Sequence, residues 1–205
     1  MNTVSTPLSD FQGFPKVARL SRECIITEKI DGTNAGIRIT EDGDFLVGSR
    51  TRWITRDVDN FGFASWCFEH QEELLRLGVG RHFGEWWGRG IQRDYGLTER
   101  RWSLFNVSRW CLAGEAPRRI PTGDPRIEKY QDELPACVGL VPVLYRGLFI
   151  TAACEEALDR LRLDGSHAAP GFMKPEGIVV YHTAAEVLFK KTLEKDGTPK
   201  NICGS

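Results

Sequence analysis

The first regular pattern along this chain is a series of short runs that are apolar or alternate apolar with polar residues, bounded by glycine and acidic residues. Residues 24–30, 34–40 and 45–49 have the composition and length of strands. The turn-forming run Glu41–Asp44 joins the last two of them. The pattern therefore predicts a strand followed by a β-hairpin.

Three later segments are predicted to be helical. Apolar positions recur at helical spacing over residues 60–77, and Gly78 and Gly80 end this stretch. Residues 151–161 form a second amphipathic stretch, and a further helix is possible over Asp124–Leu134. The positions expected to face inward are Phe63, Trp66, Cys67, Leu74 and Leu75 in the first helix, and Ala152, Ala153, Leu158 and Leu161 in the second.

The remaining apolar runs predict more strands. Residues 82–87 and 102–107 are separated by a loop rich in glycine and charge, and a further strand is expected over residues 138–143. Residues 177–181 and 186–189 predict a closing hairpin. The fold class expected is α+β, mainly antiparallel sheet with flanking helices, in one domain over residues 1–205.

Composition limits the possible partners and compartment. The 205 residues carry a net charge of −1, so any binding to nucleic acid has to come from a local patch. The six cysteines are scattered without metal-ligand spacing, as expected for a reduced protein inside the cell. The polar N-terminus has no signal-peptide core, and no segment has membrane-spanning length. A cytoplasmic location is the default expectation.

The run Glu28–Asn34 carries the first candidate chemistry. It places Lys29, Asp31 and Gly32 at the end of a short apolar strand. A lysine is a poor nucleophile unless its surroundings lower its pKa, which a buried strand end beside cations or a metal can do. Taken alone, the run is more typical of a β-turn with a solvated lysine.

Five further short motifs follow this run in order. They are Gly48-Ser49-Arg50, Phe83-Gly84-Glu85-Trp86-Trp87-Gly88, Leu104-Phe105-Asn106-Val107, Glu176-Gly177-Ile178-Val179-Val180 and Leu188-Phe189-Lys190-Lys191. Each motif alone favours an ordinary strand carboxylate, core aromatic or solvated cation. Together with Lys-Ile-Asp-Gly, the set resembles the motifs of the covalent nucleotidyltransferases, which are ATP-dependent DNA ligases, RNA ligases and capping guanylyltransferases.

This resemblance implies a nucleotidyltransferase domain of the ATP-grasp-like ligase type, and a role for each matching residue. Lys29 corresponds to the lysine that becomes linked to a nucleoside monophosphate, and Arg50 to an arginine that contacts the nucleotide. Phe105 and Val179, or less surely Ile178, would enclose the purine. The carboxylates implied to hold a hydrated Mg²⁺ or Mn²⁺ through its waters are Asp31, Glu85 and Glu176.

The Gly-Thr-Asn extension after Asp31 resembles RNA ligases of the RNA-ligase-2-like group more than DNA ligases or capping enzymes. In that group the glutamate before the lysine contacts the exocyclic amine of adenine, which implies this role for Glu28. The family asparagine corresponds to Asn34. The stretch Phe83–Gln92 is also typical of small proteins of this family.

The last motif departs from the family pattern, in which two lysines stand one residue apart. Here Lys190 and Lys191 are adjacent, so a regular strand would point them to opposite faces. The Phe-Lys match favours Lys190 as the phosphate-binding lysine, and Lys191 remains the alternative.

Only fourteen residues follow Lys191, too few for the C-terminal domain of many relatives. We expect its work to fall to the catalytic domain, to a partner protein, or to the basic loop Arg89–Arg101. That loop interleaves arginines with Tyr95 and Trp102, as a surface for a nucleic-acid backbone would. A solvated loop balanced by Asp94 and Glu99 is an equal alternative.

The resemblance thus implies an ATP-dependent RNA ligase, of the kind used in RNA repair, that forms a lysyl-AMP, transfers AMP to an RNA 5′-phosphate and seals that end to a 3′-hydroxyl. The implied ligands are ATP or AMP, Mg²⁺ or Mn²⁺, and nicked or single-stranded RNA. The alternatives are a DNA-nick ligase, an adenylyltransferase with another acceptor, and a non-catalytic nucleotide- or RNA-binding module.

Overall fold

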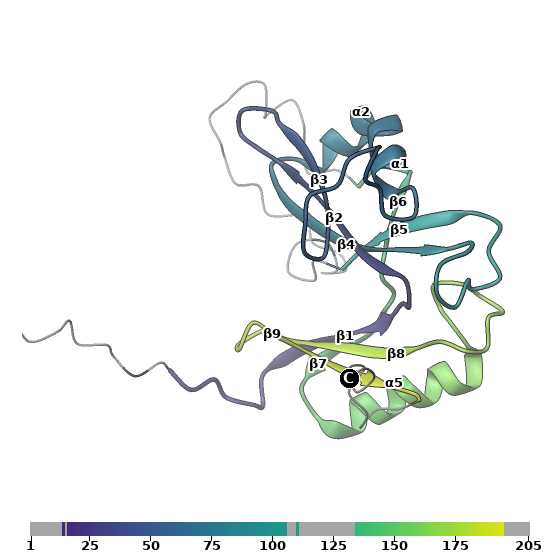
Figure 1. Cartoon of the computed structure of the whole chain (residues 1–205). Coiled ribbons are helices and arrows are strands. Elements are labelled where there is room, and N and C mark those ends of the chain that lie inside the picture. The colour runs from purple at the N-terminus through teal and green to yellow at the C-terminus, as the bar shows by residue number, and fades with distance from the viewer. Residues whose placement is uncertain (1–13, 15, 106–109, 111–133, 195–205) are drawn as a thin grey trace, which may run out of the picture.

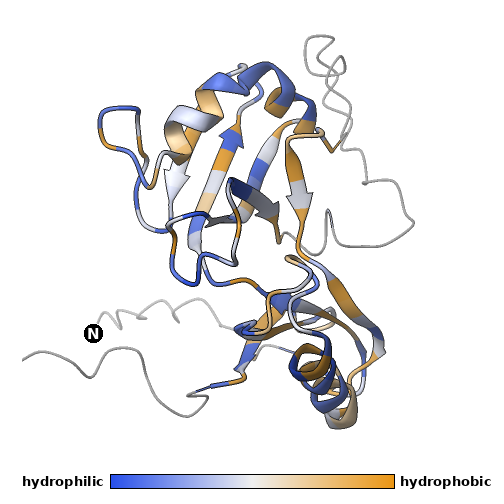
Figure 2. Cartoon of the chain, turned by 90° about the vertical axis from the view of Figure 1, so that its right-hand side faces the viewer, coloured by the Kyte–Doolittle hydropathy of each residue, from blue (hydrophilic) through white to orange (hydrophobic). Residues whose placement is uncertain are grey.

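Two β-sheets form the molecule, the upper one covered on its outer face by short helices and the lower one by a single helix (Figure 1, Figure 2). The structure is a computed structural model that describes residues 14, 16–105, 110 and 134–194. Antiparallel strands predominate and helices are few, which confirms the α+β prediction. The helix expected over Asp124–Leu134 lies outside the described residues except for Leu134, which is not helical.

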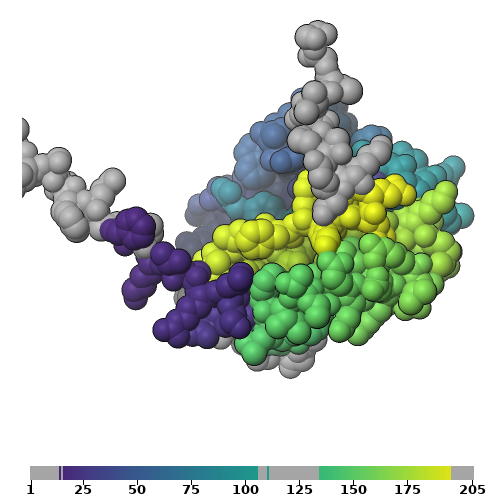
Figure 3. Space-filling model, turned by 90° about the horizontal axis from the view of Figure 1, so that it is seen from below, coloured from purple at the N-terminus to yellow at the C-terminus, as the bar shows by residue number. Residues whose placement is uncertain are grey.

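The lower sheet has the strand order β7-β1-β8-β9, with every pair antiparallel. Its strands are β1 (Glu23–Lys29), β7 (Val143–Leu148), β8 (Gly177–His182) and β9 (Val187–Thr192). Helix α5 (Thr151–Asp164) packs Leu158 and Leu161 on the outer face, against Ile26 and Ile178 of the sheet. The space-filling view from below shows α5 in green, with β9 in yellow beside it (Figure 3).

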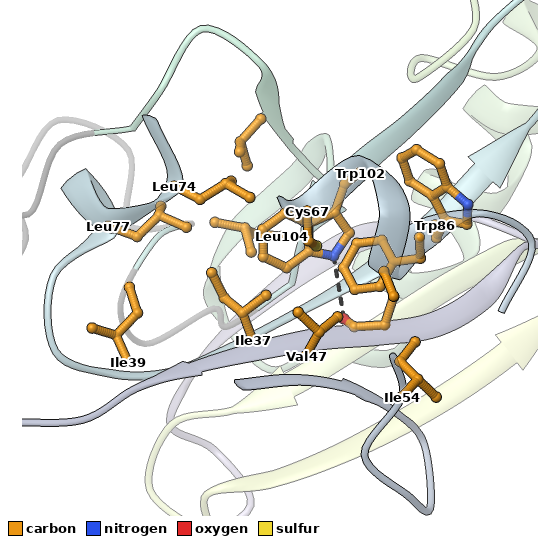
Figure 4. Packing of buried hydrophobic residues seen from close by; sticks show 14 of the residues in the cluster. Ile37, Ile39, Val47, Ile54, Cys67, Leu74, Leu77, Trp86, Trp102 and Leu104 are labelled. Carbon is orange, nitrogen blue, oxygen red and sulfur yellow. Dashed lines mark hydrogen bonds between the residues drawn. The ribbon is translucent and has the colours of Figure 1, made fainter. Parts of the chain in front are cut away.

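The upper sheet has the strand order β3-β2-β4-β5-β6, and only the β5–β6 pair is parallel. Its strands are β2 (Thr33–Ile39), β3 (Phe45–Ser49), β4 (Gly80–Gly88), β5 (Arg100–Leu104) and β6 (Val138–Leu140). Ile37, Val47 and Trp102 turn outward into a core covered by short helices (Figure 4). The indole of Trp102 also donates a hydrogen bond to the carbonyl of Ala35 at 3.2 Å, so its polar atom is satisfied within this core.

The single helix predicted over residues 60–77 is wrong. The segment forms α1 (Phe63–Glu69), α2 (Gln71–Leu74) and a 3₁₀ turn, η1 (Leu75–Leu77). The break lies at His70, whose backbone N–H and ring Nδ1 both approach the carbonyl oxygen of Trp66, at 3.1 and 2.9 Å. The apolar periodicity still predicts the burial, because Phe63, Cys67 and Leu74 are fully buried.

The strand predicted over residues 138–143 is also wrong as one element. Residues 138–140 form β6 in the upper sheet, and Val143 begins β7 in the lower sheet. Pro142 stands between them and has no N–H to donate to a ladder, whereas its carbonyl accepts the backbone N–H of Glu28 at 2.9 Å. The chain therefore crosses from one sheet to the other at this proline.

A third apolar cluster fills one end of the space between the two sheets. Ile25 and Ile30 from the lower half pack with Trp87 and Tyr95 from the upper half. All four side chains are 4% exposed or less, so the two halves share a core and are held in a defined relation. Within the described part of the chain, no helix is both long and apolar enough to cross a membrane.

Candidate active site

Lys29 is the last residue of β1 and turns toward the space between the sheets. Its neighbour across the strand pair is Gly177, and Glu176 stands directly before that glycine. Lys29 Nζ lies 2.5 Å from Glu176 Oε2. The Glu176 side chain is only 5% exposed and that of Lys29 is 22% exposed, so a largely buried carboxylate holds a partly accessible amine.

The upper sheet supplies a second buried carboxylate, Glu85 of β4. Its Oε1 accepts the backbone N–H of Gly32 at 3.0 Å, which joins the turn after Lys29 to the upper sheet. Burial raises the pKa of Glu85 to about 7, although the nearby Lys29 charge opposes this effect and the Glu176 and Asp31 carboxylates add to it. Near neutral pH this carboxyl group is thus poised between its charged and neutral forms.

Gly32 is required at this turn because the backbone of β4 passes too close for a side chain. A Cβ at position 32 would lie 2.4 Å from the carbonyl oxygen of Trp86 and 2.7 Å from Cβ of Trp87. The Asp-Gly pair therefore reflects a close approach of two chain segments, which the short-turn interpretation of the sequence does not include.

Asp31 is held by the loop between β4 and β5. Arg93 Nε donates to Asp31 Oδ2 at 2.9 Å, and the Asp31 N–H donates to the hydroxyl oxygen of Tyr95 at 2.8 Å. Gln92, Asp94 and Tyr95 all have positive φ, which costs energy for residues other than glycine. The strained loop is thus held in the conformation that places Arg93 and Tyr95 beside Asp31.

This loop is not the stacking surface that its sequence suggests. Tyr95 is 2% exposed and Trp102 is fully buried, so neither ring is available to a base. Arg101 pairs with Glu99 at 2.7 Å, and Arg100 donates to the carbonyl of Phe61. The expected interleaved surface is therefore wrong, and the alternative of internally balanced charges is closer to the structure.

Glu28, which precedes Lys29 in β1, is held by the segment after α5. Its carboxylate accepts hydrogen bonds from Ser166 Oγ at 2.6 Å and from the N–H groups of His167 and Ala168 at 2.8 and 2.9 Å. Burial raises the pKa of Glu28, and these three bonds partly offset that effect. Because a carboxylate has about four acceptor positions, one position remains for another donor.

The two lysines of the last motif lie on opposite faces of β9. Lys190 pairs with Val179 in the strand register and shares its inward face, whereas Lys191 pairs with Ile178, which packs under α5. Lys191 Nζ also forms an ion pair with Glu155 of α5. The structure thus brings Lys190 and Val179 together and directs Lys191 to the helix.

Asn34, Arg50 and Phe105 lie in a pocket of about 410 Å³ on the inner face of the upper sheet. Asn34 is the cross-strand neighbour of Glu85, so the pocket adjoins the carboxylates around Lys29. Phe105 also contacts the apolar cluster between the sheets. Of the predicted residues, Lys29 and the carboxylates thus form one group, and Asn34, Arg50 and Phe105 form an adjoining one.

The carboxylates fit a hydrated cation better than a direct protein cage. In the described part of the chain, no group of three or more acidic, histidine or cysteine side chains is arranged to hold a metal ion directly. Asp31 and Glu176 are engaged by Arg93 and Lys29, and Glu85 Oε2 has no hydrogen-bond partner among the described residues. Mg²⁺ commonly keeps several waters and uses one or two carboxylates, which matches this arrangement.

Sequence reasoning missed three residues that hold the predicted ones in place: Arg93 and Tyr95 at Asp31, and Ser166 at Glu28. Each lies more than 60 positions from its partner, and no local pattern marks it. These contacts depend on the relation of the two sheets, which spacing along the chain does not reveal.

Solved structures with the same fold come from RNA ligases. A ligand-free mutant of Naegleria gruberi RNA ligase matches with a TM-score of 0.54 and 20% identity over 84% of this chain and 50% of its own. Mutants of Naegleria gruberi RNA ligase with ATP and Mn, and with AMP and Mn, match with TM-scores of 0.52 and 0.53, at 17% and 20% identity. They are covered over 50% and 49% of their length, against 84% and 83% of this chain.

This chain therefore spans about half the length of the structures that it matches, and identities at this level show a shared fold alone. No curated protein matches the sequence. The sequence model of the RNA ligase family, in contrast, matches residues 22–192, which include every candidate site residue. The chain belongs to the RNA ligase family.

Proposed function

We propose that this chain catalyses ATP-dependent joining of RNA ends, with Lys29 as the residue that carries AMP. The observation that supports this most directly is the position of Lys29 Nζ, at the end of β1 beside the buried carboxylates Glu176 and Glu85. The adjoining pocket with Asn34, Arg50 and Phe105 has room for a nucleotide. The Naegleria gruberi RNA ligases of the same fold hold ATP or AMP together with Mn.

In the first step, Lys29 Nζ attacks the α-phosphorus of ATP, a P–N bond forms, and the bond to pyrophosphate breaks. The amine has to lose its proton before it attacks, and its contact with Glu176 has to loosen as the phosphate approaches. A bound Mg²⁺ or Mn²⁺ would neutralise the carboxylates and the triphosphate, and would favour the neutral amine. Most of the remaining work is positioning, as in other phosphoryl transfers.

The nucleoside would lie between Phe105 and Val179, with Lys190 near its phosphates. Val179 and Lys190 share the inward face of the lower sheet, whereas Lys191 is taken up by α5. This supports Lys190 as the phosphate-binding member of the pair. The attraction between a cation at this position and the phosphates becomes stronger as negative charge develops on the phosphate oxygens and the departing pyrophosphate.

Glu28 supports a preference for adenine over guanine. One acceptor position of its carboxylate remains after the bonds to the Ser166–Ala168 segment, and the exocyclic amine of adenine is a donor. Ala168, which holds Glu28, contacts the same apolar cluster as Phe105. Competition of unlabelled GTP against labelled ATP in adduct formation measures this preference.

The two later steps follow from the activated phosphate. AMP moves from Lys29 to the 5′-phosphate of an RNA end, which breaks the P–N bond and forms a phosphoanhydride. A 3′-hydroxyl then attacks that 5′-phosphate and releases AMP. Because AMP is a good leaving group, the protein needs chiefly to align the two ends.

The test is the formation of an AMP–protein adduct from labelled ATP and Mg²⁺. We expect wild type and Lys16→Ala, which removes an exposed lysine thirteen residues before Lys29, to label. Lys29→Ala should not label, and mapping should place AMP on Lys29. A folded wild type that never labels would contradict the mechanism.

Acceptor specificity is tested in the same assay. Nicked RNA, single-stranded RNA and nicked DNA are offered to the pre-formed adduct, and transfer of AMP and sealing are followed. Faster transfer to either RNA than to nicked DNA is expected. A preference for nicked DNA would assign a DNA ligase, and an adduct with no transfer to any nucleic acid would assign an adenylyltransferase with another acceptor.

A further inference from the structure

Beyond the nucleotide-contacting residues, the pocket continues along the inner face of the upper sheet as a surface of arginines and aromatic rings. Its members, called here the arginine–aromatic surface, are Arg38, Arg52, Trp53, Arg81 and Phe83. All five side chains are exposed. None of them belongs to the residues that contact ATP in the proposed first step.

Strand alternation places these residues on one face. Arg38 and Arg81 are direct neighbours in the β2–β4 pair, and Phe83 is opposite Gly36 in the same pair. Arg38 lies four residues beyond Asn34 on β2, which at about 3.3 Å per residue is roughly 13 Å. The surface therefore extends away from Asn34 along the same pocket.

Two glycines keep the floor of this surface low. Gly36 and Gly48 face each other across the β2–β3 pair. A Cβ on Gly36 would lie 3.4 Å from the Phe83 ring, and a Cβ on Gly48 would lie 3.2 Å from the Trp53 ring. The rings of Phe83 and Trp53, 45% and 54% exposed, thus flank a floor without side chains, as a flat aromatic ligand would require.

Two of the arginine charges on this surface, those of Arg38 and Arg52, are available. Arg38 and Arg52 form no ion pair with any carboxylate in the part of the chain that the structure describes, whereas Arg93, Arg146 and Arg162 elsewhere all do. In a protein with a net charge of −1, unpaired arginines on one sheet face form a local cationic patch.

We propose that the arginine–aromatic surface binds the sugar–phosphate backbone and bases of the RNA strand next to the end that is joined. This inference rests on the proposed function and assigns the RNA to a specific face. Arginines along a groove hold phosphates, and exposed aromatic rings stack on bases without regard to sequence. The rings argue against a site for the triphosphate of ATP alone, because a triphosphate offers nothing to stack on.

The test measures binding of a 5′-phosphorylated single-stranded 12-mer RNA with a 3′ fluorophore, by anisotropy over a range of salt. The test variants are Arg38→Ala/Arg52→Ala and Trp53→Ala. The matched control is Arg160→Ala/Arg162→Ala, which removes the same charge from two exposed residues of α5. Circular dichroism and thermal unfolding check that each variant is folded.

Loss of two phosphate contacts should lower the slope of log affinity against log salt by about 1.4. The ratio of wild-type to double-variant affinity should accordingly grow roughly 25-fold between 1 M and 0.1 M salt. Trp53→Ala should weaken binding at least about fivefold, with the salt slope unchanged. The control variant should bind as wild type does.

Adduct formation with labelled ATP is measured on the same samples and separates the two proposals. Adduct formation without any effect of the test variants on RNA affinity overturns the surface assignment and leaves the proposed function standing. Surface-dependent RNA binding by a wild type that never forms an adduct overturns the proposed function. A fall in adduct yield as large as the fall in RNA affinity would assign the arginines to ATP and overturn the surface assignment.

Discussion

The two sheets face each other across the candidate site but differ in whether their basic side chains have acidic partners. On the lower half, three cations are paired: Lys29 with Glu176, Lys191 with Glu155, and Arg146 with Glu23. On the inner face of the upper sheet, Arg38 has no carboxylate partner among the described residues. Buried or paired ions hold a fixed geometry, whereas unpaired surface cations remain available to an anionic ligand.

This difference suggests a division of labour. In the proposed mechanism, the lower sheet holds Lys29 in place before any ligand arrives, and the upper sheet presents groups that a nucleotide or nucleic-acid strand would engage. Glu85 and Asp31 belong to neither pattern fully, because they join the halves through Gly32 and Arg93. The contacts between the sheets therefore connect the residues around Lys29 with the pocket on the upper sheet.

The largest expected effect tests whether the two halves depend on each other. Phe63→Ala removes a fully buried ring from the upper core and should lower the free energy of unfolding by about 3–5 kcal/mol. Because the cluster around Trp87 joins the sheets, Trp fluorescence and circular dichroism should report one urea transition. Two separated transitions would show that the halves unfold independently.

Glu85→Gln should separate stability from chemistry at the contact between the sheets. With the pKa of Glu85 at about 7, the folded state binds more protons than the unfolded one, so stability falls as pH rises from about 4.5 to about 7. The variant lacks this slope and should be more stable at pH 8. Its rate of adduct formation should fall about 10- to 100-fold, as for loss of a group that orients a metal.

The pH profile of this variant is the control for the assignment. In wild type, the rate of adduct formation should rise through an inflection that depends on Glu85, and Glu85→Gln should lose it. An unchanged profile in the variant would place the titration on another group. The measurement is single-turnover labelling between pH 5.5 and pH 9.

Asp59→Ala should destabilise the upper half without touching the site. The Asp59 carboxylate accepts the N–H groups of Asn60, Ala64 and Ser65 and the hydroxyl of Ser65, at the start of α1. We expect a loss of about 1–2 kcal/mol, the usual cost of removing a helix cap. Thermal unfolding measures it.

The pH dependence of that loss has a defined sign. Burial acts to raise the pKa of Asp59, but the four hydrogen bonds outweigh it, and the pKa lies below its ordinary value. A lowered carboxyl pKa contributes stability above the unfolded pKa of about 3.9, and this is lost as pH falls through the folded value. The difference between wild type and variant should thus shrink in acid; a constant difference would contradict this account.

The smallest expected effects come from substituting the two adjacent lysines of β9 separately. Lys190→Ala should slow adduct formation roughly tenfold, the worth of one bond to a charged group. Lys191→Ala should leave that rate unchanged and cost at most about 1 kcal/mol of stability, because its pair with Glu155 is well exposed. A reversed result would move the phosphate contact to Lys191. Single-turnover labelling and urea unfolding give the two numbers.

Much of the fold follows from local pattern. The strand before Lys29, the hairpin closed by Glu41–Asp44, and the closing hairpin all match the structure within a few residues. Buried positions in the 60–77 segment are also foreseeable, although the break at His70 is not. That break lies at His70, where the residue leaves the helical conformation, and the periodicity does not encode it.

The exchange of sheets at Pro142 shows the same limit. The apolar run over residues 138–143 has strand composition throughout. The proline alone does not indicate that the residues before it join one sheet and the residues after it join the other. The partner strands, β5 and β1, are distant in sequence, so the pairing is a property of the assembled fold.

The order of short motifs by itself indicated the family and predicted the candidate site residues, because chemistry that needs a lysine, carboxylates and cations leaves those residue types in the chain. Tertiary structure alone decided which face each side chain occupies. It separated Lys190 from Lys191, buried the rings of the basic loop, and gathered Arg38 with Trp53 on one surface. The physical reason is that strand register and sheet packing set side-chain direction, and both depend on contacts between residues far apart in the sequence.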